Sequence, residues 1–131
     1  MSELAATTIG RLFMQRLKLK ELLRINGPRL DELETKPRYV ALRATINRRY
    51  DRNYNAAWDL DEKMATVPIE TPSDLAVLLL LAEWREREND PFQHELAQRL
   101  RERVAEYQRP PTIPGNVIML FRAEGIAQPL G

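Results

Sequence analysis

Nine prolines punctuate this chain, and they separate segments whose apolar residues recur with helical periodicity. Proline fixes its own backbone angle and lacks an N–H, so helices usually begin or end beside it. Only five glycines accompany the prolines, and no strand-like alternation precedes the C-terminal tail. The pattern predicts an all-α protein, a small helical bundle built on an antiparallel helical hairpin, with an apolar C-terminal tail.

Four helices are predicted within one helical domain over residues 1–109, followed by a Pro-rich turn and docking tail over 110–131. The first helix is expected to stop at Asn26–Gly27–Pro28, and the second and third to form the antiparallel hairpin. The predicted helices cover residues 8–25, 37–65, 72–88 and 91–108.

Cap residues support the starts of the third and fourth helices. Thr71 followed by Asp74 has the spacing of a capping box, and Asp90 precedes a first-turn proline. In the tail, residues 116–124 fit a short helix as well as an added strand. They are too apolar to stay in water, so the tail is expected to dock on this chain or on a neighbour.

Composition excludes several classes of site. The chain has no cysteine, which removes disulfides, thiolate zinc sites, iron–sulfur ligation and cysteine nucleophiles. A chain of 131 residues can bury a core without such cross-links. The longest apolar run, residues 75–82, is far shorter than the ~20 residues of a membrane span. We therefore expect a cytoplasmic protein without membrane contact.

Charge is distributed unevenly along the chain. Residues 1–50 carry eleven Lys/Arg against five Asp/Glu, a balance of +6, and residues 51–109 carry eight against thirteen, a balance of −5. Such a chain can pack one half on the other, pair with a second copy, or keep a basic patch for an acidic partner.

The segment Asn47–Trp58 interleaves arginine with aromatic residues. At about 100° per residue the aromatic rings fall on or near an apolar stripe, where Asn53 is the polar member, which favours packing over base stacking. Four arginines gather on the opposite side, where they can contact nucleic-acid phosphates or form a solvated face that acidic side chains partly neutralise. These nucleic-acid candidates are Arg38, Arg48, Arg49 and Arg52.

Catalytic and metal-binding patterns are incomplete. His94 begins H-E-L-A-Q, where the second histidine of a zinc-protease motif is replaced by Gln98, and it is the only histidine. Carboxylate groups around residues 59–62 and 83–88 are expected to form solvated, ion-paired faces. We expect no enzyme activity, no catalytic residues, no cofactor and no metal.

The third helix is apolar on every side in its first turns, and the tail is apolar as well. This excess favours a non-enzymatic helical interaction or regulatory protein that self-associates as a homo-oligomer or binds another protein. The alternatives are a monomer with its tail folded back and a nucleic-acid-associated protein. Candidate interface residues are Leu78, Leu81, Trp84, Ile118 and Phe121.

A tryptophan-bearing helix followed by MATVPIETPSDLAVLLLLAEW, over about residues 50–84, resembles a recurring pattern in uncharacterised small helical proteins of bacteria and their phages. Those proteins share a turn of Ala-Thr-Pro type, a second threonine and a Leu/Ala-rich helix. This chain departs from them by the additional Val67 and by the lack of a lysine in the apolar run. The resemblance implies a helical hairpin and no particular activity.

Overall fold

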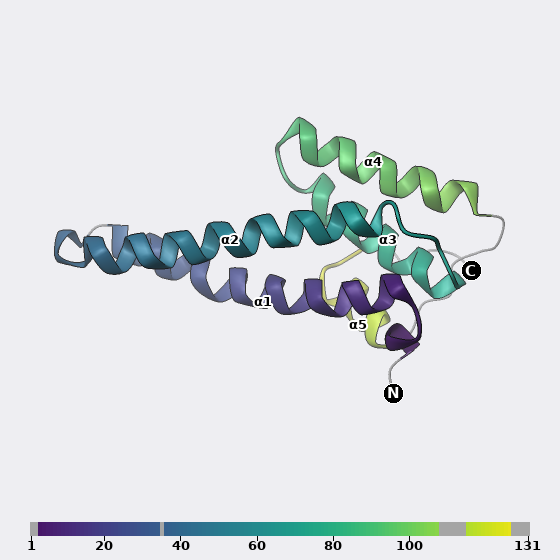
Figure 1. Ribbon diagram of the computed structural model, residues 1–131, viewed down its shortest axis with the longest axis horizontal. Helices are drawn as coiled ribbons and strands as arrows, with labels where there is room; N and C mark the ends of the chain where they lie inside the picture. Colours follow the sequence, from purple (N-terminus) through teal and green to yellow (C-terminus); the bar gives the residue numbers. More distant parts are fainter. Residues whose placement is uncertain (1–2, 35, 108–114, 127–131) are drawn as a thin grey trace. The chain divides into compact units, whose positions relative to one another are not determined.

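The computed structural model describes residues 3–34, 36–107 and 115–126, which are helical throughout apart from short connections and contain no strand (Figure 1). The all-α prediction is confirmed. Two short 3₁₀ helices, η1 (Glu3–Ala6) and η2 (Pro37–Tyr39), precede the first two α-helices. The α-helices of the described ranges are α1 (Thr8–Glu34), α2 (Val40–Met64), α3 (Pro72–Glu86), α4 (Pro91–Glu106) and α5 (Gly115–Ala123).

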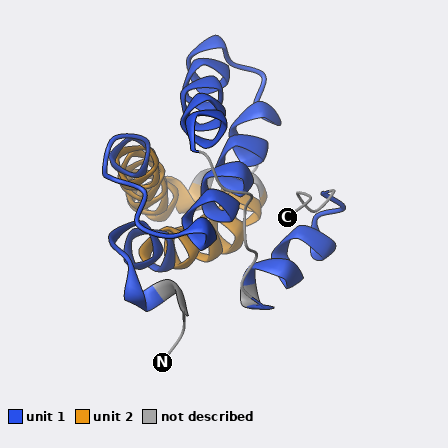
Figure 2. Ribbon diagram, turned by 90° about the vertical axis from the view of Figure 1, so that its right-hand side faces the viewer, with its two compact units in different colours: residues 1–14, 62–131 blue, residues 15–61 orange. Residues whose placement is uncertain are grey.

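Packing divides the chain into two compact units (Figure 2). Unit 2, residues Gln15–Asp61, is an antiparallel hairpin made from most of α1 and most of α2 (Figure 1). Unit 1, residues Met1–Met14 and Glu62–Gly131, contains the α3·α4 pair and α5. This grouping follows packing, whereas the predicted division into 1–109 and 110–131 follows sequence order. The predicted hairpin of the second and third helices would combine helices of different units, and it stays a prediction.

The predicted end of the first helix is wrong, because α1 continues through Pro28 to Glu34. Proline removes one helical hydrogen bond and crowds the preceding turn. Here the proline is exposed, so water can solvate the released carbonyl. The next turns are kept helical by packing in the hairpin, where Leu30 and Leu33 are half-buried. A Cβ added at Gly27 would lie 3.7 Å from the ring of Tyr50, so α1 and α2 approach closely there.

A buried ion pair joins the two helices of the hairpin. Arg16 Nε donates to Asp61 Oδ1 at 2.9 Å, and Asp61 has no exposed surface. The expectation of a solvated carboxylate is therefore wrong for Asp61. Ile46 and Ala57 are the other buried residues among those described in this unit.

Helix α3 forms the centre of unit 1, and its predicted burial on every side is confirmed. Leu75–Leu78 and Leu80–Ala82 have no exposed surface. The ring of Phe13 stacks on Trp84 with centroids 5.9 Å apart. Apolar residues of α4 and α5 complete this core: Leu96, Ala97, Leu100, Val117 and Phe121.

The Asp74 half of the predicted capping box and the predicted Asp90 cap are formed, whereas the Thr71 hydroxyl is buried without a hydrogen-bond partner among the described residues. Asp74 Oδ2 accepts from the backbone N–H groups of Glu70 and Thr71 at 2.9 and 3.4 Å, while Oδ1 accepts from the Thr7 hydroxyl at 2.7 Å. The buried Asp74 thus ties the start of α1 to the start of α3. Asp90 Oδ1 accepts from the N–H of Phe92 at 2.8 Å and begins α4.

A side chain of α4 caps the end of α2 and the turn that follows it. Arg103 donates to the carbonyl of Met64 at 2.7 Å and to that of Val67. Burial lowers the pKa of the Arg103 guanidinium from its usual value. The arginine therefore pairs the last carbonyl of the helix, which has no partner within the helix, and one carbonyl of the turn after it.

The open choice between helix and strand for the tail is resolved, since α5 is a helix. The N–H of Gly125 donates to the carbonyl of Arg122, and the N–H of Ile126 donates to the carbonyl of Phe121. Together with the φ of +67° at Gly125, these bonds form a Schellman motif at the end of α5. Glu124 fixes α5 to α3. Its Oε2 accepts from Trp84 Nε1 and from Arg87 Nη1, the latter at 3.1 Å.

Candidate interaction surface

The hairpin of unit 2 leaves apolar side chains in water. Between residues 17 and 45 no described residue is buried, in contrast to α3. Each helix of a two-helix hairpin has one neighbour, so much of its surface stays open. Four large apolar residues of this stretch are exposed: Leu22 (44%), Ile25 (50%), Val40 (65%) and Leu42 (44%).

The same unit is basic. Residues 15–61 carry eleven Lys/Arg against seven Asp/Glu, a balance of +4, and the remainder of the chain carries nine against twelve, a balance of −3. The apolar side chains of the hairpin therefore lie on a positively charged surface.

The predicted arginine face is exposed, and its members have different surroundings. The Arg38 guanidinium lies 4.9 Å from the centroid of the Tyr39 ring, and Arg48 donates weakly to the Thr45 hydroxyl at 3.4 Å. Neither Arg49 nor Arg52 forms an ion pair with any residue that the structure describes.

Arg87 and Arg101 of unit 1 differ in this respect, whereas Arg99 and Arg122 likewise form no ion pair with a described residue. Arg101 pairs with Glu83 at 2.9 Å and with Glu86, and Arg87 pairs with Glu124. The hydrogen bond with Arg101 lowers the pKa of Glu86 and raises that of Arg101. Glu83 and Glu86 of α3 are thus ion-pair partners, as the sequence indicated for these two carboxylates.

A groove of about 330 Å³ opens between α1 and α2 within the hairpin. It is lined by Leu22 and Asn26 of α1 and by Arg49, Arg52 and Asn53 of α2. The structure brings two of the four predicted arginines together here and leaves Arg38 and Arg48 outside the groove.

The asparagines of the groove were not predicted as site residues. The position of Asn53, a polar residue on an apolar stripe, is the one sequence signal for this site. The sequence gives no such signal for Asn26, because Asn-Gly-Pro is typical of the end of a helix. Both amides are half-buried.

The predicted interface residues pack within unit 1. Leu78, Leu81 and Phe121 are at most 1% exposed and Trp84 is 6% exposed, while Ile118 is half-buried. The four buried side chains belong to α3 and α5 and offer little surface to a partner.

His94 is exposed, and its Nε2 lies 2.6 Å from the carbonyl of Glu88. Because a carbonyl only accepts, Nε2 is the protonated nitrogen in this contact. No group of three or more His, Cys, Asp or Glu side chains suited to a metal ion occurs in the described part of the chain.

Among the described helices, none combines the length and the apolar character needed to cross a membrane. No family model, no curated protein and no solved structure matches this chain. The resemblance over residues 50–84 stays a prediction.

Proposed function

We propose that this chain is a non-enzymatic helical interaction protein that self-associates through the hairpin of unit 2. The observation that supports the proposal is the exposure of Leu22, Ile25, Val40 and Leu42 on a stretch without buried residues. Two such hairpins that pack against each other form a four-helix bundle, in which each helix gains the neighbours it lacks.

The association is expected to be weak. Full burial of a Leu, Ile or Val side chain stabilises by roughly 1.5–3 kcal/mol, so covering the exposed half of one contributes about 1 kcal/mol. Eight such side chains in a dimer contribute about 8 kcal/mol before the cost of association, which sets a Kd no tighter than about 1 μM.

Salt should strengthen this association. Each hairpin carries a balance of +4, so two copies repel one another, and added salt screens that repulsion while leaving apolar burial intact.

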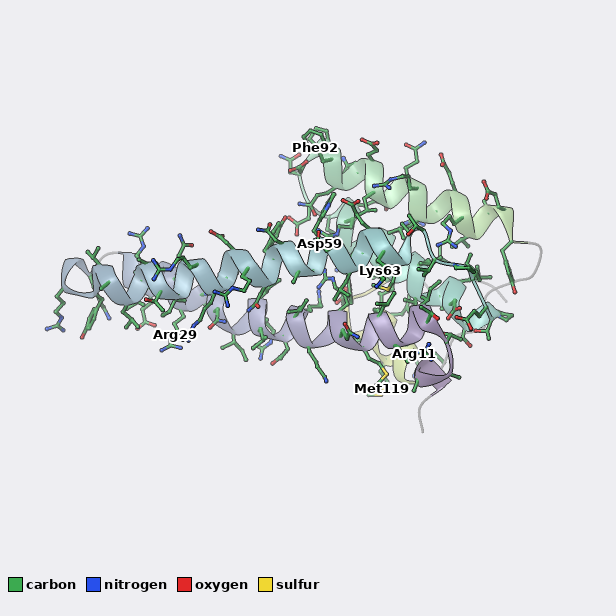
Figure 3. The ribbon with its side chains drawn as sticks, in the orientation of Figure 1. Arg11, Arg29, Asp59, Lys63, Phe92 and Met119 are labelled. Atoms are coloured by element: carbon green, nitrogen blue, oxygen red, sulfur yellow. The ribbon has the colours of Figure 1, made fainter. Side chains whose placement is uncertain are left out.

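Sedimentation velocity between about 1 μM and about 1 mM, the range set by the affinity limit above, tests the proposal. The double variant Leu22→Ser/Ile25→Ser should remain monomeric where the unmodified chain dimerises. The matched control is Phe92→Ser/Met119→Ser, because these residues are 73 and 70% exposed and project from unit 1 (Figure 3). A monomer at every concentration, or equal loss in the control, would contradict the proposal.

A second candidate function is contact with nucleic-acid phosphates through the arginines of the hairpin. Its support is the absence of ion pairs at Arg49 and Arg52 among the described residues, together with the +4 balance of unit 2. Fluorescence anisotropy with labelled DNA and RNA should show binding that falls steeply between about 50 and about 200 mM salt. Reversal of Arg48, Arg49 and Arg52 to glutamate should abolish it, and no binding at the lower salt would refute this candidate.

A further inference from the structure

The groove between α1 and α2 collects hydrogen-bonding groups that nothing else in the described chain uses. Arg49, Arg52, Asn26 and Asn53 line it, and none of these four side chains forms a hydrogen bond or ion pair with another described residue. Each guanidinium offers five N–H donors, and each amide offers two donors and an acceptor. By contrast, the four arginines at positions 85, 87, 101 and 103 of unit 1 all hold a protein partner.

The residues that line the groove suit a ligand with three parts: an anionic group, a hydrogen-bonding group and an apolar surface. Among the residues that the structure describes, none that lines the groove is acidic. Two guanidinium groups three residues apart on one helix face can hold phosphate oxygens in charge-assisted hydrogen bonds. An amide can pair with the edge of a base, and Leu22 supplies an apolar surface beside the arginines.

The dimensions favour an unpaired strand. A volume of about 330 Å³ is at the low end of small-ligand pockets. A base inside a duplex presents only its groove edges, whereas a single-stranded base can turn outward to meet an amide and an apolar side chain.

We propose that this groove holds one nucleotide unit of a single-stranded nucleic acid, with Arg49 and Arg52 on phosphate oxygens and Asn26 and Asn53 on the base or sugar. The proposal rests on the second candidate function and adds to it a defined site. It requires that binding depend on uncharged groove residues, and not only on the number of arginines.

Anisotropy titrations of a labelled single-stranded oligonucleotide and the matching duplex test the site. The variants Arg49→Gln/Arg52→Gln and Asn26→Ala/Asn53→Ala should each weaken single-strand binding by about tenfold or more. The first should also lower the slope of log K against log salt by about 1.4, for two phosphate contacts on a single strand. Duplex should bind more weakly than the single strand.

The matched control is Arg38→Gln/Arg48→Gln, which removes the same charge from the same region outside the groove. This variant should lose only the binding free energy that comes from the general attraction between positive charge and phosphates. Equal losses in the two arginine doubles, or an asparagine double that binds like the unmodified chain, would overturn the groove site and leave the second candidate function standing. A chain that binds no nucleic acid would overturn both.

Inorganic phosphate distinguishes a free phosphate ligand from a nucleic acid. Phosphate offers only the group that Arg49 and Arg52 would hold, so it should displace the oligonucleotide less effectively than a nucleoside monophosphate at the same ionic strength. Equal displacement by phosphate and by the nucleoside monophosphate, lost in Arg49→Gln/Arg52→Gln, would overturn the nucleic-acid assignment. In circular dichroism melts no variant should unfold below the unmodified chain, since the arginines are exposed and alanine favours helix more than asparagine does.

Discussion

Replacing Asp61 by asparagine should strongly destabilise the hairpin. Asp61 is fully buried, its partner Arg16 is 7% exposed, and the Nε to Oδ1 distance is 2.9 Å. The substitution keeps the shape of the side chain but removes its charge, so the buried arginine loses the negative charge that Asp61 supplies. Breaking a buried pair in this way costs about 3–5 kcal/mol in the free energy of unfolding.

Urea denaturation followed by far-UV circular dichroism measures this cost. Replacing both partners, in Arg16→Met/Asp61→Leu, should recover most of the loss, because no charge then remains buried. The exposed pair Glu21–Arg24 is the control, with side-chain exposures of 56 and 69%, and Glu21→Gln should leave the denaturation curve unchanged. A cost below about 1 kcal/mol for Asp61→Asn, as at exposed pairs, would refute the reasoning.

Three further substitutions test other contacts. Gly27→Ala should change the free energy of unfolding by less than about 1 kcal/mol, since the entropic gain of alanine opposes crowding of its Cβ by Pro28 and Tyr50 lies at an ordinary 3.7 Å; a loss above about 2 kcal/mol would contradict it. Arg103→Met should lower it by roughly 1.5–3 kcal/mol because two carbonyls lose a charged donor, and an unchanged melting curve would count against that cap. The pKa of Glu86 is lowered by Arg101, so its contribution is present above the ordinary pKa and is lost as pH falls through the folded value. Melts from neutral pH down to about pH 3, below the ordinary range of a glutamate pKa, should therefore show less acid sensitivity for Glu86→Gln, and an identical pH dependence would exclude a role for this pair.

The parts of the fold that the sequence predicts are those in which local signals and burial agree. The wholly apolar start of α3 requires burial on every side, and the aspartates at positions 74 and 90 act within one turn of their own helices. Each of these depends on neighbours in sequence, so periodicity and capping rules suffice.

The failures come from long-range contacts. Pro28 is a stop signal by local rules, and only the packing of the following turns against α2 keeps the helix intact. Asp61 looks like a solvated carboxylate until Arg16, 45 residues earlier, is placed beside it. Asn26 likewise lines the groove together with residues that come more than twenty positions later in the sequence. The spacing of residues within one helix cannot predict such a contact between two helices.

The two proposed uses of the hairpin should exclude each other. Leu22 belongs to the exposed apolar surface and also lines the groove, so a second copy that covers it closes the nucleotide site. A single-stranded oligonucleotide that binds only the monomer must shift the equilibrium away from the dimer, and dimerisation must weaken oligonucleotide binding by the same factor.

Added salt should shift the equilibrium from the oligonucleotide complex towards the dimer, because it weakens phosphate contacts and strengthens association of two like-charged hairpins. Sedimentation with a labelled oligonucleotide at about 50 mM salt should therefore show the label on a monomer-sized species, and dimer should return at about 200 mM, where phosphate contacts are weakened. Label that sediments with a dimer at both salt concentrations would show that the groove and the association surface are separate.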